Sequence, residues 1–357
     1  MQRLRWIVVL VLLSGRAASA QSPEVSLREF ASGQIKKGVR SIGFGGDGAT
    51  WGNYGLVYRE HDTAVVDAGV TAFTNGNTFA FTAVGVTSPP LWRGLAIYVL
   101  GLAQTATGVR LGVRDPSFGP ATLEVRGDGG DELLAVRLAM PLGHGFSIGL
   151  QLTYEVSHFD AILDGQMSAI RYETEWRPSG GLGVAWMPNA RWLIGARVIL
   201  NHDWERRLDP AGVREGLNRS YEFRAGVSFS PWRGALLDVG GTVLDRANEI
   251  AGTESVVGGA NLGFEQAFWR RAFVIRGGVD ECELGIGPNC TATGGMSFKM
   301  GPVNLDVAYL YNLGQARIGA LFGNHSHSVL ATLTLDYGSL VHRSAEQAAE
   351  TQAARRH

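Results

Sequence analysis

Two stretches of the chain match patterns that carry chemistry in other proteins. In the first, GFGGDG, residues Gly43, Gly45 and Gly48 stand at the spacing of the G-x-G-x-x-G dinucleotide fingerprint. That fingerprint works only between a buried strand and a helix whose N-terminus meets the pyrophosphate. Neither is visible in the flanking sequence, so we interpret these glycines, together with Gly46, as positions that permit a tightly folded backbone. We therefore expect no cofactor.

The second stretch is NHSHS, in which His325 and His327 could share one face of a strand and ligate a metal. No third ligand stands nearby in the sequence, so we predict no metal site. His144, His158 and His202 are candidate catalytic bases, but no local signature ties any of them to a nucleophile. The sequence therefore predicts a protein that is not an enzyme.

The only cysteines, Cys282 and Cys290, lie in the segment ECELGIGPNC. In an exported protein such a pair most often forms a local disulfide, and we expect one here. Export itself is indicated by residues 1–20, where two arginines and a short apolar run precede Ala-Ser-Ala. The apolar run is far shorter than the roughly 20 residues of a membrane-spanning helix, so we expect cleavage after Ala20.

Period-2 alternation is the main structural signal of the mature chain. In Gly145–Ser157, GFSIGLQLTYEVS, every second residue is apolar and every residue between is polar or glycine. This is the pattern of a strand with one apolar and one wet face, and its length suits a tilted strand that crosses a bilayer. Similar segments recur to the end of the chain. The predicted strands are 63–74, 77–88, 93–105, 132–142, 145–157, 178–187, 191–202, 220–230, 234–245, 256–268, 271–280, 291–300, 302–313 and 326–337.

Apart from the first, the tight hairpin turn Asn75-Gly76-Asn77, the connections between these fourteen strands alternate in length. The short ones are SPPLWRG, PLGHG, MPNAR, SPWRG, FWRRA and MGP, as expected for the periplasmic turns of an outer-membrane barrel. The long ones are placed near 106–131, 158–177, 203–219, 246–255, 281–290 and 314–325, of which the first two could instead extend strands or add a hairpin. Five tryptophans, at 92, 186, 192, 232 and 269, lie within or beside short turns, as expected at a bilayer interface.

Composition agrees with an exported sheet protein. The chain has 49 glycines, 18% charged residues and a net charge of −1, which gives no sign of a nucleic-acid partner. We predict an all-β fold, a monomeric transmembrane antiparallel β-barrel in the outer membrane of a Gram-negative bacterium. Its parts are a signal peptide at 1–20, an N-terminal plug segment at 21–62, the barrel at 63–337 and a polar periplasmic tail at 338–357. Outer-membrane lipid and the barrel-assembly machinery are its expected partners.

The parity of each strand predicts which residues face the lumen. Charges of both signs fall on that face, which favours an ion-paired interior over an ion-selective ring. The predicted charged lumen residues are Asp67, Arg137, Glu155, Arg197, Glu222, Arg224, Asp238, Glu265, Arg276, Lys299, Asp306 and Asp336. Strands near 77–105 also place apolar groups there, namely Val84, Val86, Tyr98, Leu100 and Leu102. Part of the lumen is therefore expected to be apolar.

The segment REFASGQIKKGVRSIGFGGDGATWGNYG is rich in small residues and precedes the first predicted strand. With the signal peptide and about fourteen strands, it makes the mature chain resemble the FadL-type outer-membrane transport family for long-chain fatty acids and other hydrophobic compounds. The resemblance implies that residues 21–62 fold into the lumen as a hatch, and that substrate leaves through the wall or past the hatch. One departure is that the family's Asn-Pro-Ala is missing, and the corresponding stretch reads VYREHDT.

The resemblance implies passive uptake of hydrophobic small molecules such as fatty acids or aromatic hydrocarbons. The expected substrate contacts are Phe44, Trp51, Tyr54 and Tyr58 in the plug and Tyr98 and Leu100 on the wall. Each plug aromatic has the alternative role of packing the plug against the wall. The rival interpretation is a porin-like channel for polar solutes, or a barrel with only a structural or interaction role, which the short outer loops and the charged lumen favour.

Overall fold

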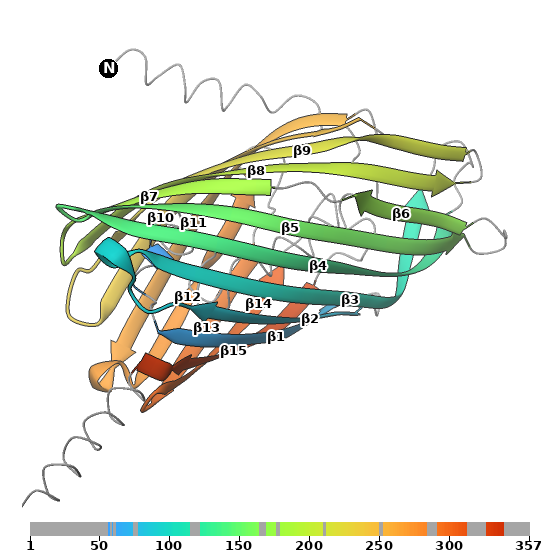
Figure 1. The fold of residues 1–357 in the computed structure, drawn as a ribbon. Coiled ribbons are helices and arrows are strands. Elements are labelled where there is room, and N and C mark those ends of the chain that lie inside the picture. The colour runs from blue at the N-terminus through green and yellow to red at the C-terminus, as the bar shows by residue number, and fades with distance from the viewer. Residues whose placement is uncertain are drawn as a thin grey trace, which may run out of the picture.

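The computed structural model is a closed antiparallel β-barrel (Figure 1). It describes residues 56–57, 59, 62–73, 78–114, 122–163, 169–175, 179–209, 212–249, 253–283, 291–312 and 326–338. The strands are β1 (Thr63–Phe73), β2 (Thr78–Thr87), β3 (Ala96–Arg114), β4 (Thr122–Gly143), β5 (Phe146–Leu163), β6 (Ala169–Glu175), β7 (Ser179–Asn189), β8 (Trp192–Asp209), β9 (Gly212–Phe229), β10 (Ala235–Asn248), β11 (Thr253–Phe268), β12 (Phe273–Glu283), β13 (Thr291–Met300), β14 (Val303–Asn312) and β15 (Ser326–Asp336). Within these ranges, no helix is long and apolar enough to cross a membrane.

The fifteen described segments occupy fourteen positions in the wall. Both β6 and β7 lie between β5 and β8: β6 pairs with the far halves of its two neighbours, and β7 pairs with the halves next to the short turns. They therefore act as one interrupted strand. Because β1 pairs with β15 from Thr63↔Asp336 to Phe73↔Ser326, the sheet closes on itself. The predicted all-β class and fourteen-strand count are confirmed.

Strand β5 shows why the wall has two faces. Leu150, Leu152 and Tyr154 are exposed on its outer side, whereas Gln151 and Glu155 are buried on its inner side. Glycine or a small polar group at the inner positions leaves room for the longer polar side chains of neighbouring strands. The alternation predicted from the sequence thus separates an apolar outside from a polar inside.

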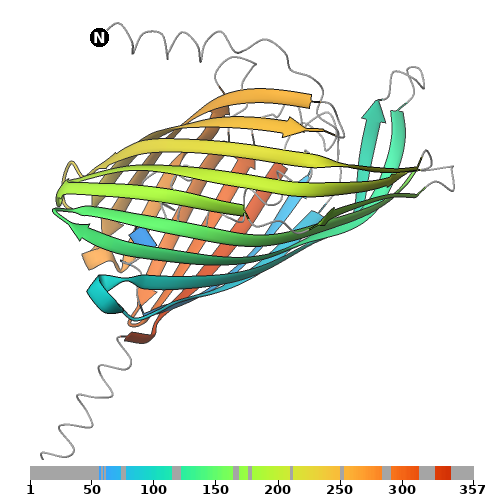
Figure 2. The same ribbon diagram turned by 45° about the horizontal axis from the view of Figure 1, so that its top comes forward.

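Several strands run past the predicted boundaries. The segment 203–219 was expected to be a loop, but β8 and β9 stay paired through it, with Asp209 opposite Gly212. Similarly, β3 and β4 pair as far as Arg114 and Thr122, and Figures 1 and 2 show this end of the hairpin turned away from the barrel. In the β8–β9 extension polar and charged residues interrupt the apolar face, so alternation weakens while the backbone ladder continues, whereas Val109, Leu111 and Val113 keep the alternation in the β3 extension. The prediction of a loop at 203–219 was therefore wrong, and the extension allowed for 106–131 is confirmed.

The six predicted short connections are all present, and they gather at one end of the barrel (Figure 1). The seam between the first and last strands closes at the same end. There the Tyr337 amide donates to the Asp62 carbonyl over 2.9 Å, and the Tyr337 hydroxyl donates to the Thr87 carbonyl on β2. Burial, and then the nearby Asp62 carboxylate, raises the pKa of this hydroxyl above its usual value.

The signal peptide, most of the plug segment and nearly all of the tail lie outside the described residues, so these domain boundaries remain predictions. Cys282 lies in β12 opposite Ala260 of β11, and Cys290 lies outside the described residues. The expected disulfide also remains a prediction.

Candidate functional site

An apolar surface lines the lumen on β2, β3 and β4. It consists of the buried residues Val57, Ala83, Tyr98, Leu100, Leu102, Leu133, Ala135 and Ala139, which we call the lumen patch. The strand register brings them together, because Ala83 is opposite Leu102 on β3 and Leu102 is opposite Leu133 on β4. Of the predicted wall contacts, Tyr98 and Leu100 both lie in this patch. Sequence reasoning missed Leu133 and Ala135, because the β4 segment LLAVRLA is apolar on both faces.

Tyr98 lies across the wall at the edge of the lumen patch. A Cβ added to Gly85 on β2 would come within 2.3 Å of the Tyr98 hydroxyl and 2.7 Å of its ring, so only glycine leaves space for the ring. On the other side, the Arg137 guanidinium carbon stands 5.3 Å from the ring centroid, and Arg137 Nε donates to Gln151 Oε1 over 2.6 Å. Tyr98 therefore marks the border between apolar and polar lumen surface.

The chain just before β1 contacts the wall at two places. Val57 is buried in the lumen patch. Two residues later, Arg59 Nη1 donates to the Met187 sulfur on β7 over 3.0 Å. The predicted plug residues Phe44, Trp51, Tyr54 and Tyr58, and the glycines Gly43, Gly45, Gly46 and Gly48, lie outside the described residues.

A smaller apolar cluster lies on the opposite side of β1. Ala308 and Leu310 of β14 and Leu330 of β15 are all buried and face the lumen, with Ala308 opposite Leu330. They share the inner face with Asp306, two residues before Ala308. The lumen is therefore apolar on β2–β4 and on part of β14–β15.

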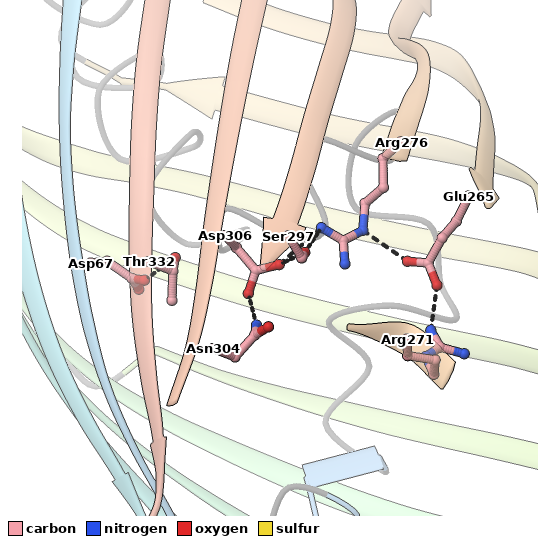
Figure 3. Close-up of polar contacts among 8 residues, drawn as sticks. All are labelled: Asp67, Glu265, Arg271, Arg276, Ser297, Asn304, Asp306 and Thr332. Carbon is pink, nitrogen blue, oxygen red and sulfur yellow. Dashed lines mark hydrogen bonds and ion pairs between the residues drawn. The ribbon is translucent and has the colours of Figure 1, made fainter. Parts of the chain in front are cut away.

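The rest of the described lumen carries ion pairs, the largest group of which spans β11 to β14 (Figure 3). Arg276 of β12 lies between two carboxylates: its Nε is 2.8 Å from Glu265 Oε2, and its Nη1 is 2.9 Å from Asp306 Oδ1. Ser297 and Asn304 donate to Asp306, and Arg271 reaches Glu265 from the short turn. Together the two guanidinium groups, of Arg276 and Arg271, balance the formal charge of the two buried carboxylates.

Similar pairing occurs elsewhere on the inner wall. Glu222 lies between Arg224 and Arg197, whose Nη2 is 3.6 Å from its Oε1. Asp238 accepts from Ser228 over 2.5 Å and from the Asn261 amide over 3.3 Å. The prediction of a mixed-sign, ion-paired interior is confirmed.

Two predicted lumen residues lie on the other face. Val84 and Val86 are 53% and 47% exposed on the outside of β2, and their neighbours Ala83 and Gly85 face the lumen. The register with β3 places Gly85 opposite Leu100, which turns the small residues inward and the two valines outward. The prediction that Val84 and Val86 face the lumen was therefore wrong.

A hollow of about 580 Å³ opens on the outer side of the same strands. Gly101, one of the residues that line it, has no side chain, and a Cβ there would meet nothing within 4 Å. Leu102 and Leu133 border the hollow and also belong to the lumen patch. Only one layer of strands separates the hollow from the patch.

The described residues contain no group of three or more His, Cys, Asp or Glu side chains that could hold a metal ion. The described residues form a closed barrel with fourteen strand positions, and its lumen has an apolar region and an ion-paired region. The fold thus defines the class of this protein as a closed antiparallel barrel.

No protein-family model and no curated protein matches the chain. Among solved structures, the TodX deltaS2S3 mutant, a monoaromatic hydrocarbon channel, has a TM-score of 0.56 at 9% identity and covers 84% of this chain and 98% of its own. A FadL homologue from Pseudomonas aeruginosa has a TM-score of 0.53 at 12% identity, covering 84% and 96%. The monoaromatic hydrocarbon channel CymD has a TM-score of 0.51 at 11% identity, covering 83% and 98%. At the level of the fold, the resemblance to FadL-type channels is confirmed.

Proposed function

We propose that the protein is a monomeric outer-membrane transporter for the passive uptake of hydrophobic small molecules, such as fatty acids or aromatic hydrocarbons, in a Gram-negative bacterium. The observation that carries this proposal is the lumen patch. Inner positions of an outer-membrane barrel are normally polar, because they line water. When another apolar group covers apolar side chains there, each Å² of apolar surface removed from water stabilises the contact by about 25 cal/mol. An amphipathic substrate meets that need, since its ionic or polar end can stay near the ion-paired wall.

A membrane setting is supported by the outer surface. Every described strand except β6 has ten residues or more, which is enough for a tilted strand to cross a bilayer. Exposed leucine, valine and phenylalanine cover the middle of the outer wall, and tryptophans stand beside the short turns. Phe146 stacks on Trp186 with ring centroids 5.3 Å apart, and Trp192 lies 4.4 Å from Phe229. This is the pattern of an aromatic belt at a membrane interface.

The route we propose passes the N-terminal segment. Residues 21–62 would form a plug, and the burial of Val57 in the lumen patch supports this position. Substrate would first meet Phe44, Trp51, Tyr54 or Tyr58 in the plug and then Tyr98 and Leu100 on the wall. The hollow behind Leu102 and Leu133 supports exit through the wall rather than past the plug.

The test measures ligand binding and transport by the full-length protein in liposomes. A fluorescent fatty acid is titrated against wild type, a Leu100→Asn/Leu102→Asn variant and a Leu310→Asn control, which places the same change in the smaller cluster. We expect the double variant to weaken binding about tenfold, because about 1.4 kcal/mol of lost apolar contact is sufficient. The control is expected to bind as wild type does. Equal affinity of all three proteins would contradict the proposal.

The second candidate is a channel for polar solutes, which the ion-paired wall from β5 to β14 favours. Entry of a small sugar into the same liposomes distinguishes the two. Sugar permeation without binding of fatty acid or alkylbenzene would support the channel and refute the transporter. Deletion of residues 30–55 is expected to abolish ligand binding if the plug contributes to the site.

A further inference from the structure

The short turns of the barrel share a charge pattern. Four of the six connections at this end place an arginine directly beside a tryptophan. The pairs are Trp92 with Arg93, Arg191 with Trp192, Trp232 with Arg233, and Trp269 with Arg270; together we call them the Trp-Arg ring. All eight side chains are exposed, with Trp92 and Trp269 at 71% and 78%. The six connections contain no Asp or Glu; Asp62 and Asp336 lie at the seam, and Glu265 of β11 contacts Arg271.

Two of these arginines have a backbone conformation that is uncommon for residues other than glycine. Arg93 has φ 55° and ψ 26°, and Arg270 has φ 57° and ψ 36°, both in the left-handed region. Tight hairpin turns normally place glycine or asparagine there, because other side chains are strained. Neither arginine is buried, so packing does not compensate the strain. His144 in the β4–β5 turn, and Trp269 and Arg271 beside Arg270, also have positive φ, so this conformation is a property of the short turns.

The geometry of the first pair shows what a bound partner would meet. The Arg93 guanidinium carbon lies 4.4 Å from the centroid of the Trp92 ring, so the cation stands directly over the indole. An indole favours the boundary between acyl chains and headgroups, and a guanidinium binds phosphate through two parallel hydrogen bonds. The pair therefore suits a lipid whose acyl chain lies along the ring and whose phosphate reaches the arginine.

We propose that the Trp-Arg ring binds anionic phospholipids, of the phosphatidylglycerol type, around the short-turn end of the barrel. The inference rests on the membrane setting of the proposed function but not on transport. Arg271 is excluded, because it turns inward to Glu265. Charge complementarity selects the lipid: the connections at this end carry only positive formal charge, although the whole chain has a net charge of −1. Zwitterionic lipid would satisfy the phosphate contact but would gain nothing from the excess charge.

The test uses the full-length protein in vesicles that contain brominated phosphatidylcholine or brominated phosphatidylglycerol. Bromine quenches tryptophan fluorescence at short range, so the ring tryptophans report which lipid lies beside them. We expect stronger quenching of wild type by the phosphatidylglycerol than by the phosphatidylcholine. In Arg93→Gln/Arg233→Gln, this preference should fall about fivefold for each arginine removed. The matched control is Arg206→Gln/Arg219→Gln, two exposed arginines in the other half of β8–β9, which should keep the preference.

Raising the salt concentration should reduce the preference of wild type, since these charges are exposed. Equal quenching by the two lipids in wild type would overturn the proposal. An equal loss of preference in the control variant would also overturn it, because it would show that net charge, and not the position of the arginines, determines which lipid is preferred. If neither lipid quenches, the membrane setting itself fails, and this result is distinct from any outcome of the transport assay.

Discussion

Replacement of Arg276 by methionine tests whether the lumen charges depend on one another. Arg276, Glu265 and Asp306 have side chains only 3%, 2% and 4% exposed, and Arg276 is within 2.9 Å of both carboxylates. Methionine keeps most of the volume but removes the shared cation, which leaves two buried carboxylates with less compensation. Breaking a buried pair in this way costs about 3–5 kcal/mol. Arg271 still contacts Glu265, so we expect the lower end of that range.

The measurement is equilibrium urea unfolding in detergent micelles, followed by tryptophan fluorescence. A triple variant, Arg276→Met with Glu265→Gln and Asp306→Asn, should recover most of the lost stability, since no uncompensated charge remains. Arg206→Met is the control: its partner Glu215 is 3.5 Å away and both side chains are about half exposed, at 48% and 47%. That change should cost roughly 0–1 kcal/mol.

Two results would refute the reasoning. If Arg276→Met is no more destabilising than Arg206→Met, the network is solvated by lumen water and its burial does not matter. If the triple variant is as unstable as the single one, the loss comes from packing and not from charge.

Three further predictions concern the wall. A closed barrel should resist SDS, because every strand edge is paired, so unboiled protein should migrate differently from boiled protein on a gel; identical migration would contradict closure. Cys282 and Cys290 should be joined in exported protein and contribute about 2 kcal/mol or more, whereas two alkylatable thiols in a mass spectrum would exclude the bond. Gly85→Ala should displace the Tyr98 ring and weaken fatty-acid binding several-fold with little change in gel migration, and Gly101→Ala, where a Cβ meets open space, is the control that should bind normally.

Much of the wall could be predicted from the sequence, because a barrel in a membrane separates apolar and polar residues at every second position. In β5 that separation is complete, and its faces were predicted correctly. In β2 it is not: the segment FTAVGVT is apolar or small on both faces. Hydrophobicity then cannot tell which side faces inward. The register with β3 determines which face of β2 points to the lumen, because Gly85 must face inward to leave space for Tyr98.

The extensions and the site illustrate two further limits. Beyond Leu200 on β8, His202 and Arg206 interrupt the apolar face, so the alternation weakens although the strand continues to Asp209. In the lumen, the sequence placed Arg276, Glu265 and Asp306 on the inner face, but it could not show that Arg276 is shared. Sharing depends on the alignment of four successive strands, β11 to β14, which pattern alone does not determine.

The pairing of the first strand with the last determines the order in which the barrel can be made. Hairpins such as β4–β5 join neighbouring segments of the chain, but β1 has an unpaired edge until β15 pairs with it. Closing the wall therefore comes late, and in one step it brings together two strands that nearly the whole length of the barrel sequence separates. Tyr337 follows β15 directly, and its hydroxyl reaches past β1 to Thr87 on β2. The residue that secures the seam is thus the last of the wall in chain order, and a chain truncated before β15 would leave β1 without its partner, as an open sheet with two exposed edges.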